Sequence, residues 1–430
     1  MTGVQTCALP IFPPVTDGVA NAVVNYAKIL TDEGKKATVV TPAYPDADDS
    51  QFPFAVVRYP SVDLTKLVGY HAGFPFSSQT LEKLEEQKFD LIHCHCPVTS
   101  AMLARALRDR ISAPLVFTYH TKFDIDIANA IKGKLLQEEA KKVLVDNITA
   151  CDEVWTVSRG AGENLRSLGY QGDYLVMPNG VDFAKGRVEE GFVREVTKDF
   201  DLPENVPVFL FVGRMMWYKG LKIILDALAM LSTLGTDFRM VFVGNGGDRD
   251  EVIAYCGKLG LNGRVFFTAP AYDRNVIRAW YCRADLFLFP STFDTNGLVV
   301  REAAACGLGS VLVRGSCAAE DIQDGESGFL IEENARSMAE MLSKLSKNRD
   351  LMRRVGKTAQ EEIYISWADA VHKASQRYEL VLENFRAGKY PAHNRQSDEA
   401  FHAIASYLAA AGRRQEKRKQ RMEELAERFL

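Results

Sequence analysis

Residues 208 to 222 read VFLFVGRMMWYKGLK, an apolar run that ends at a glycine and is followed by a charged loop and a helical pattern. A short run that is apolar throughout is typical of a strand buried on both faces of a parallel sheet. The same unit recurs at 285–291, where DLFLFPS precedes a helix expected to begin at Leu298. Strands that alternate with helices predict an α/β fold with doubly wound, Rossmann-like parallel sheets.

A charged stretch interrupts this alternation once, and 430 residues are enough for two hydrophobic cores. We therefore predict two domains that face a cleft, with ligands at the carboxyl ends of the strands. The predicted divisions are an N-terminal acceptor-binding domain at 12–185, a linker at 186–200, a C-terminal nucleotide-sugar-binding domain at 201–366, a helix at 367–385 that returns to the N-terminal domain, and a basic helical tail at 386–430.

The first eleven residues, MTGVQTCALPI, do not read like the apolar strand that should open an α/β domain. They resemble the in-frame translation of a sequencing-adapter oligonucleotide. We interpret residues 1–11 as a non-native segment that replaced the true first strand, and we expect the loss of that core strand to impair folding. A genuine but unusual N-terminus is the alternative.

Composition excludes several classes of protein. The chain is 47% hydrophobic and 25% charged, as in globular proteins, and its net charge of -4 does not favour nucleic-acid binding. Its 8 cysteines are scattered, which argues for a reducing cytoplasm rather than a disulfide framework. No apolar run reaches about 18 residues and no signal peptide is evident, so we expect a cytoplasmic protein without a membrane span.

The strongest candidate site is DTNGLVVRE at 294–302. Its glycine precedes the start of a helix, where free N–H groups and the helix dipole favour an anion such as a diphosphate. Asp294 and Glu302 could accept hydrogen bonds from sugar and ribose hydroxyls. The alternative is that Asp294 caps the helix and Glu302 pairs on its surface. The predicted donor contacts here are Asn296, Gly297, Leu298 and Val299.

Two cations follow the strand that ends at Gly213. Arg214 and Lys219 suit a departing diphosphate, because they would stabilise the charge that grows as the sugar bond breaks. Ordinary surface cations are the alternative. A glycine-rich turn after the next strand also resembles a nucleotide loop, although such turns end plain strands as well. Its predicted donor-binding residues are Gly244, Asn245 and Gly246.

The first half offers weaker candidates. Gly18 precedes a helix start, and His120 ends a strand where it could hydrogen-bond the transferred sugar, although a core or surface histidine is the more common case. Asp124 and Asp126 could line the acceptor side or be merely solvated. The sequence HCHC at 93–96 does not predict a metal site, since alternate strand residues point to opposite faces.

Three segments carry a family resemblance, in this order along the chain: the PNGVD turn at Pro178–Asp182, the GR-x4-KG loop at Gly213–Gly220, and FPS…GL…EA at Phe289–Ala303. On these motifs the chain, from about Phe12 to Asn384, resembles the retaining glycosyltransferases of family 4, which have the GT-B fold. The two glutamates of that family, separated by seven residues, align here with Asp294 and Glu302.

The resemblance implies a role for each matching residue. Arg214 and Lys219 would bind the diphosphate of a nucleotide-sugar donor. Glu302 would bind the ribose and Asp294 the sugar hydroxyls. Residues 297–298 would offer backbone N–H groups to the sugar or phosphate.

In the other domain the resemblance implies that His120 contacts the sugar and that Gly18 lies against the donor. It also implies retention of configuration and no requirement for a metal or other cofactor. Two departures bear on sugar choice: Asp294 is one methylene shorter than the usual glutamate, and Asn296 replaces an aromatic residue.

The wording FPPVTDGV at 12–19 and TYHTKFDID at 118–126 is most similar to bacterial family members that glycosylate membrane lipids such as diacylglycerol. This implies transfer of a hexose, glucose, from a UDP-sugar at the inner face of the membrane. A lysine-bearing helix expected at 129–148 could lie on anionic lipid, or be an ordinary amphipathic surface helix. Other readings are a soluble or polysaccharide acceptor, a GT-B-fold epimerase or phosphorylase, and an inactive nucleotide-sugar binder.

Overall fold

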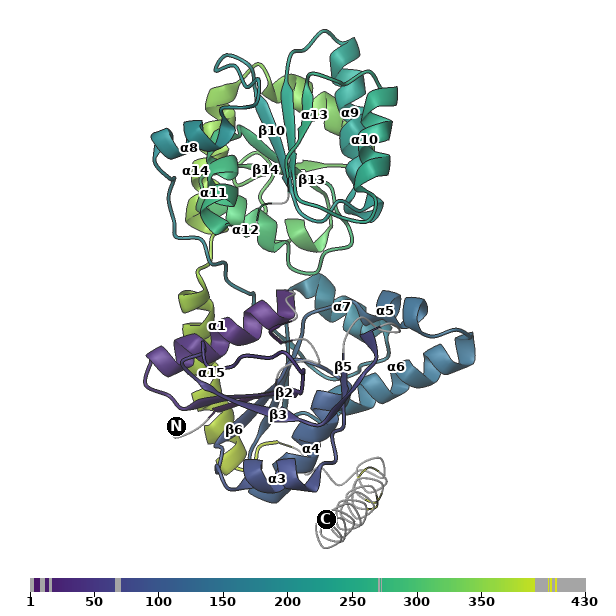
Figure 1. The fold of residues 1–430 in the computed structure, drawn as a ribbon, viewed down its shortest axis with the longest axis vertical. Coiled ribbons are helices and arrows are strands. Elements are labelled where there is room, and N and C mark those ends of the chain that lie inside the picture. Colours follow the sequence, from purple (N-terminus) through teal and green to yellow (C-terminus); the bar gives the residue numbers. More distant parts are fainter. Residues whose placement is uncertain are drawn as a thin grey trace, which may run out of the picture. The chain divides into compact units, whose positions relative to one another are not determined.

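The computed structural model describes residues 4–7, 12–14, 18–65, 71–269, 271, 273–390, 401, 403 and 407. The chain divides into two compact units, each with its own parallel sheet and surrounding helices (Figure 1). Unit 1 comprises Met1–Pro178 and Val371–Leu430, and unit 2 comprises Asn179–Ala370. The α/β class and the two doubly wound sheets predicted from the sequence are confirmed.

Within the described residues, the sheet of unit 1 has seven strands in the order β3-β2-β1-β6-β7-β8-β9. These are β3 (Ala55–Tyr59), β2 (Ala37–Pro42), β1 (Val4–Cys7), β6 (Leu91–Cys94), β7 (Leu115–Tyr119), β8 (Glu153–Thr156) and β9 (Leu175–Val176). Two further strands, β4 (Ser61–Asp63) and β5 (His71–Gly73), pair antiparallel. The helices are α1 (Gly18–Asp32), α3 (Ser78–Glu85), α4 (Thr99–Ile111), α5 (Phe123–Ala130), α6 (Lys134–Thr149), α7 (Arg159–Ser167) and, from Val371 onward, α15 (Trp367–Arg386), which begins in unit 2.

Strand β1 corrects one sequence-based expectation. We expected the first core strand to be missing, yet Val4–Cys7 pairs in parallel with β2 on one side and with β6 on the other. The interior position between β2 and β6 is therefore filled. The proposed origin of residues 1–11 stays a prediction, because strand pairing does not report where a sequence comes from.

Two other segments differ from the sequence-based prediction. The helix expected over 129–148 is two helices, α5 and α6, separated at Gly133, whose φ of 101° lies outside the helical region. The predicted linker at 186–200 contains α8 (Glu190–Thr197), which contacts α11 (Arg274–Arg283) and belongs to unit 2. The predicted basic tail lies largely outside the described residues.

Unit 2 has a six-stranded sheet in the order β12-β11-β10-β13-β14-β15. Its strands are β12 (Val265–Phe267), β11 (Arg239–Val243), β10 (Val208–Val212), β13 (Leu286–Phe289), β14 (Ser310–Val313) and β15 (Phe329–Ile331). Beside α8 and α11, its helices are η1 (Trp217–Lys219), α9 (Leu221–Thr233), α10 (Arg249–Lys258), α12 (Leu298–Ala305), η2 (Cys317–Ala319), α13 (Ala335–Leu345) and α14 (Arg349–Glu362).

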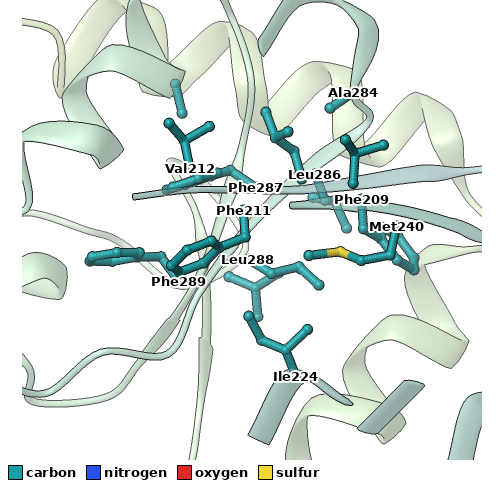
Figure 2. Packing of buried hydrophobic residues seen from close by; sticks show 14 of the residues in the cluster. Phe209, Phe211, Val212, Ile224, Met240, Ala284, Leu286, Phe287, Leu288 and Phe289 are labelled. Carbon is teal, nitrogen blue, oxygen red and sulfur yellow. The ribbon is translucent and has the colours of Figure 1, made fainter. Parts of the chain in front are cut away.

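The core of unit 2 explains why its strands read as continuous apolar runs. Every residue of β10 and β13 is buried, because helices cover both faces of a parallel sheet. Figure 2 shows the aromatic residues of these two strands packed together, and the rings of Phe211 and Phe289 stack with centroids 6.1 Å apart. This packing fixes the two central strands, and with them the loops that leave their carboxyl ends.

The interior position of β1 can be tested with a proline at Thr6. Thr6 pairs with Val39 of β2 and His93 of β6, and proline is excluded from central strands because it cannot donate to the ladder. Thr6→Pro should destabilise unit 1 by roughly 2 kcal/mol or more, measured by urea denaturation. Thr6→Val keeps the N–H group and serves as the control. Equal stability of both variants would show that residues 4–7 do not form this strand.

Candidate active site

Three loops of unit 2 meet because the strands before them are parallel neighbours. Strand β10 pairs with β13 on one side and with β11 on the other, so the carboxyl ends of all three strands lie at one edge of the sheet. The loop at Gly213 follows β10, the turn at Gly244 follows β11, and Pro290 follows β13. The predicted donor residues of these loops are therefore brought together.

Glycines allow the loops to approach this closely. A Cβ atom at Gly244 would lie 2.1 Å from the carbonyl oxygen of Gly213, and one at Gly246 would lie 2.3 Å from that of Met215. Gly220 has a φ of 77°, and its Cβ would lie 2.4 Å from the carbonyl oxygen of Pro290. The glycine-rich turn thus has a packing role in addition to any contact with a ligand.

Lys219 and Asp294 form an ion pair between two of these loops. Lys219 ends η1 and is buried, and its ammonium group lies 5.7 Å from the centre of the Phe289 ring. The second carboxylate oxygen of Asp294 accepts a hydrogen bond of 2.6 Å from the buried hydroxyl of Ser291. The carboxylate is held on both sides, which fixes its position at the edge of the sheet.

Arg214 differs from Lys219 in its surroundings. It lies in the same loop but is exposed, and within the described part of the chain its side chain makes no ion pair or hydrogen bond. Asn245 of the neighbouring turn is also exposed, and its carbonyl oxygen accepts from the N–H of Met215 at 2.9 Å. Arg214 is thus a cation available to an anionic ligand at the rim of the site.

The start of α12 has the geometry expected of an anion site. Gly297 takes a left-handed conformation, with φ of 58°, and no side chain caps the helix. The first helical bond is donated by Val300, so the N–H groups of Leu298 and Val299 have no acceptor inside the helix. Asp294 therefore does not cap this helix, so the structural alternative that the sequence left open for Asp294 does not apply.

Glu302 lies in α12 and is buried rather than exposed on the helix surface. One of its oxygens accepts a hydrogen bond of 2.6 Å from Arg274, and the other accepts one of 3.0 Å from the hydroxyl of Tyr281. Burial raises the pKa of the Glu302 carboxyl, and the charge of Arg274 opposes that shift. The structure thus provides two fixed carboxylates, at 294 and 302.

In unit 1, His120 is buried and its Nε2 lies 2.9 Å from Nδ1 of His95. Burial lowers the pKa of His120 to about 3, so the ring is neutral at physiological pH. A neutral imidazole presents one donor and one acceptor, which suits a sugar hydroxyl. Both ring nitrogens of His93 are engaged, at 2.5 Å by Tyr378 and at 2.7 Å by Thr118.

The remaining candidates of unit 1 are less informative. Gly18 is the first residue of α1, and a Cβ there would meet nothing within 4 Å, so no described neighbour demands a glycine. Asp124 accepts a hydrogen bond of 3.3 Å from Asn164. Asp126 belongs to α5, but its side chain lies outside the described residues.

Sequence reasoning missed three residues that touch the site carboxylates: Ser291, Arg274 and Tyr281. Ser291 belongs to the FPS motif, so its place beside Asp294 could have been anticipated. Arg274 and Tyr281 lie 28 and 21 positions from Glu302, at spacings that carry no local pattern. The contact between α11 and α12 brings them to Glu302.

Two doubly wound sheets, with cations and glycine turns at the strand ends of one of them, define a class of α/β proteins that bind phosphorylated ligands. Two family models match the chain: Glycosyltransferase Family 4 over residues 16–185 and Glycosyl transferases group 1 over residues 193–362. The chain belongs to glycosyltransferase family 4, and it is a glycosyltransferase with the GT-B fold.

Relatives of known name support this assignment at low identity. The chain is 23% identical over 364 residues to the alpha-monoglucosyldiacylglycerol synthase of Acholeplasma laidlawii, an alignment that covers 79% of this chain and 89% of the relative. It is 27% identical over 332 residues to the D-inositol 3-phosphate glycosyltransferase of Nocardia farcinica, which covers 73% of this chain and 72% of the relative.

Solved structures share the fold. Sucrose-phosphate synthase of Thermosynechococcus elongatus matches with a TM-score of 0.70 and 20% identity, over 89% of this chain and 100% of that protein. HepE of Anabaena, solved in complex with UDP, matches with a TM-score of 0.69 and 18% identity, over 88% of this chain and 100% of that protein.

The contact between Gly220 and Pro290 can be tested by paired glycine substitutions. Gly235 has a similar φ of 72° but open space around its Cβ position. Gly235→Ala should therefore cost about 1 kcal/mol, for backbone strain alone. Gly220→Ala should cost about 3 kcal/mol, because the contact with the Pro290 carbonyl adds to the strain. Equal losses of unfolding free energy in the two variants would contradict this close approach.

Proposed function

We propose that the chain transfers a hexose, glucose, from a UDP-sugar to an acceptor with retention of configuration and without a bound metal. The observation that carries the proposal is the Lys219–Asp294 ion pair beside the start of α12. It places a cation, a carboxylate and free helix N–H groups at one strand edge. Those are the groups needed for a diphosphate and for sugar hydroxyls.

Each group takes one part of the donor. Arg214 and Lys219 bind the diphosphate and stabilise the charge that develops as the sugar bond breaks. The N–H groups at the start of α12 add to that stabilisation. Asp294 accepts hydrogen bonds from the sugar, and Glu302 accepts them from the ribose. HepE, one of the structural neighbours, was solved with UDP and with UDP-glucose, which favours the same donor here.

Retention follows in this proposal from a front-face route. The leaving phosphate oxygen takes the proton of the acceptor, so no enzymic nucleophile is required. Both oxygens of Asp294 are engaged, one by Lys219 and the other by Ser291. A carboxylate held in this way suits hydrogen bonding to hydroxyls better than attack on the sugar carbon.

For the acceptor we propose a membrane lipid such as diacylglycerol, reached from the inner face of the membrane. Among the described residues, no helix combines the length and apolar character needed to cross a bilayer. Helix α6 instead exposes Leu135, Leu136 and Val143. An exposed apolar stripe next to lysines suits the interfacial region of a membrane. The name of the Acholeplasma laidlawii relative points to the same acceptor class.

The charges of α6 limit how far electrostatics can contribute to this binding. Lys141 pairs with Glu138 at 2.9 Å, and Lys142 pairs with Glu139 at 2.6 Å. Exposed pairs of this kind largely cancel the attraction of their lysines for anionic lipid. Leucine burial should therefore supply more of the binding than lysine charge does.

Replacement of Lys219 tests the diphosphate role. Lys219→Ala should lower kcat/KM for UDP-glucose by about two to three orders of magnitude, which corresponds to about 3–4 kcal/mol of lost transition-state stabilisation. The measurement is UDP release in the presence of diacylglycerol. Lys222→Ala is the matched control, because Lys222 lies three residues on and pairs with Asp226 at the exposed surface. Normal turnover by Lys219→Ala would refute the role.

Liposome flotation tests the lipid surface. The double variant Leu135→Ser/Leu136→Ser should lose most of its binding to vesicles of phosphatidylglycerol and phosphatidylcholine. Burial of each leucine side chain in the membrane should contribute about 2 kcal/mol to the binding free energy. Leu234→Ser removes an equally exposed leucine from unit 2 and should bind as the unaltered chain does. Failure of the unaltered chain to float with either neutral or acidic vesicles would count against a lipid acceptor.

A further inference from the structure

The Glu302 carboxylate is the most deeply buried acidic group of the candidate site, and its partners come from outside the motifs that define the family resemblance. It is 7% exposed, and a buried carboxylate is costly unless it is paired and hydrogen-bonded. Arg274 and Tyr281 supply one hydrogen bond to each oxygen. Each oxygen of the carboxylate thus accepts one hydrogen bond from the protein itself, without any ligand.

Both partners come from one face of α11. Arg274 is the first residue of this helix, and Tyr281 follows seven positions later, which places both side chains on the same side of the helix. That side packs on α12, where Glu302 lies. Tyr281 is fully buried, so its hydroxyl is fixed by packing. The rotation of α11 therefore sets the direction of the Glu302 carboxylate.

Arg274 is itself held in place by the PNGVD turn, a motif to which we assigned no function from the sequence, and by the phenylalanine that follows it. Its guanidinium lies 4.3 Å from the centre of the Phe183 ring, and Nη2 lies 3.7 Å from a carboxylate oxygen of Asp182. The Arg274 side chain is 43% exposed. The cation is anchored by the turn while part of it faces solvent.

We propose that Arg274 and Tyr281 are positioning residues that hold Glu302 ionised and oriented to accept both hydroxyls of a vicinal diol, the ribose of the nucleotide donor. A carboxylate has about four lone-pair sites on two oxygens, and on each oxygen of Glu302 one of them accepts a hydrogen bond from Arg274 or Tyr281. One site on each oxygen remains, which matches two adjacent hydroxyls. This inference rests on the proposed function, because it takes the donor to be a nucleotide with an intact ribose.

The charge balance shows what Arg274 contributes. Burial is the largest influence on the Glu302 carboxyl and raises its pKa, Arg274 and Tyr281 act to lower that pKa, and Asp182 acts to raise it. Without Arg274 the carboxyl should take up a proton at a higher pH. A protonated carboxyl loses acceptor capacity, so ribose recognition should then fail as the pH falls.

The ligand-binding test compares UDP with 2′,3′-dideoxy-UDP by isothermal titration calorimetry. The unaltered chain should prefer UDP by on the order of tenfold or more, since hydrogen bonds to a charged acceptor are strong. Arg274→Met and Tyr281→Phe should reduce that preference to about threefold or less. In Arg274→Met, UDP affinity should also fall more steeply from about pH 8 to about pH 6. Arg274→Lys, which keeps the charge, should restore part of the preference.

Arg336→Gln is the matched control, because Arg336 pairs with Glu340 at 3.0 Å on the exposed face of α13 in the same unit. It should bind both nucleotides as the unaltered chain does. Variants that keep the full preference for UDP would overturn the positioning role while leaving the donor assignment intact. An unaltered chain that binds both nucleotides equally would overturn Glu302 as the diol site. Absence of UDP binding by the unaltered chain would refute the proposed donor and, with it, this inference.

Thermal unfolding gives a readout that needs no ligand. A carboxyl whose pKa is raised in the folded state contributes stability below its unfolded pKa, about 4.3, and that stability is lost as the pH rises. In Arg274→Met the folded pKa should be higher still. The Tm difference between this variant and the unaltered chain should therefore widen from about pH 5 to about pH 8. A constant difference would show that Arg274 does not keep Glu302 ionised.

Discussion

The parallel pairing of β10 with β13 is the constraint on which the site depends. Parallel neighbours end at the same edge, so the loops after Val212 and Phe289 must meet there. Phe211, the residue before the end of β10, stacks in the core on Phe289, the last residue of β13. This contact fixes where the two loops begin relative to each other. The Lys219–Asp294 ion pair joins residues 75 positions apart as a direct consequence.

Much of this arrangement could be predicted because it follows from strand order. Strands read as short apolar runs, and a glycine or charged residue after each run places a loop at the carboxyl edge. That reasoning was sufficient for Lys219, Asp294 and the glycines of the turn at 244–246. It was not sufficient for the partners of Glu302, since the contact between α11 and α12 depends on how two helices rotate against one sheet.

The segments that were mispredicted failed for local physical reasons. The apolar spacing through residues 129–148 continues across Gly133, yet Ile131 takes an extended conformation that ends α5, and Gly133, with a positive φ, precedes the start of α6. Helix α8 lies in a charged stretch, and its few apolar residues pack on α11, so composition alone favoured a linker. At β1 the backbone of VQTC pairs with β2 and β6, although this sequence is not the continuous apolar run that we expected of an interior strand.

The Lys219–Asp294 pair also bears on how a spent donor leaves the enzyme. If the donor binds as proposed, its sugar offers Asp294 hydroxyl groups in exchange for the lysine, which frees Lys219 for the diphosphate. A nucleoside diphosphate without a sugar would offer no such exchange, and Asp294 would keep its ion pair with Lys219. We therefore expect the carboxylate to weaken the grip on the product relative to the donor, and so to favour turnover over product inhibition.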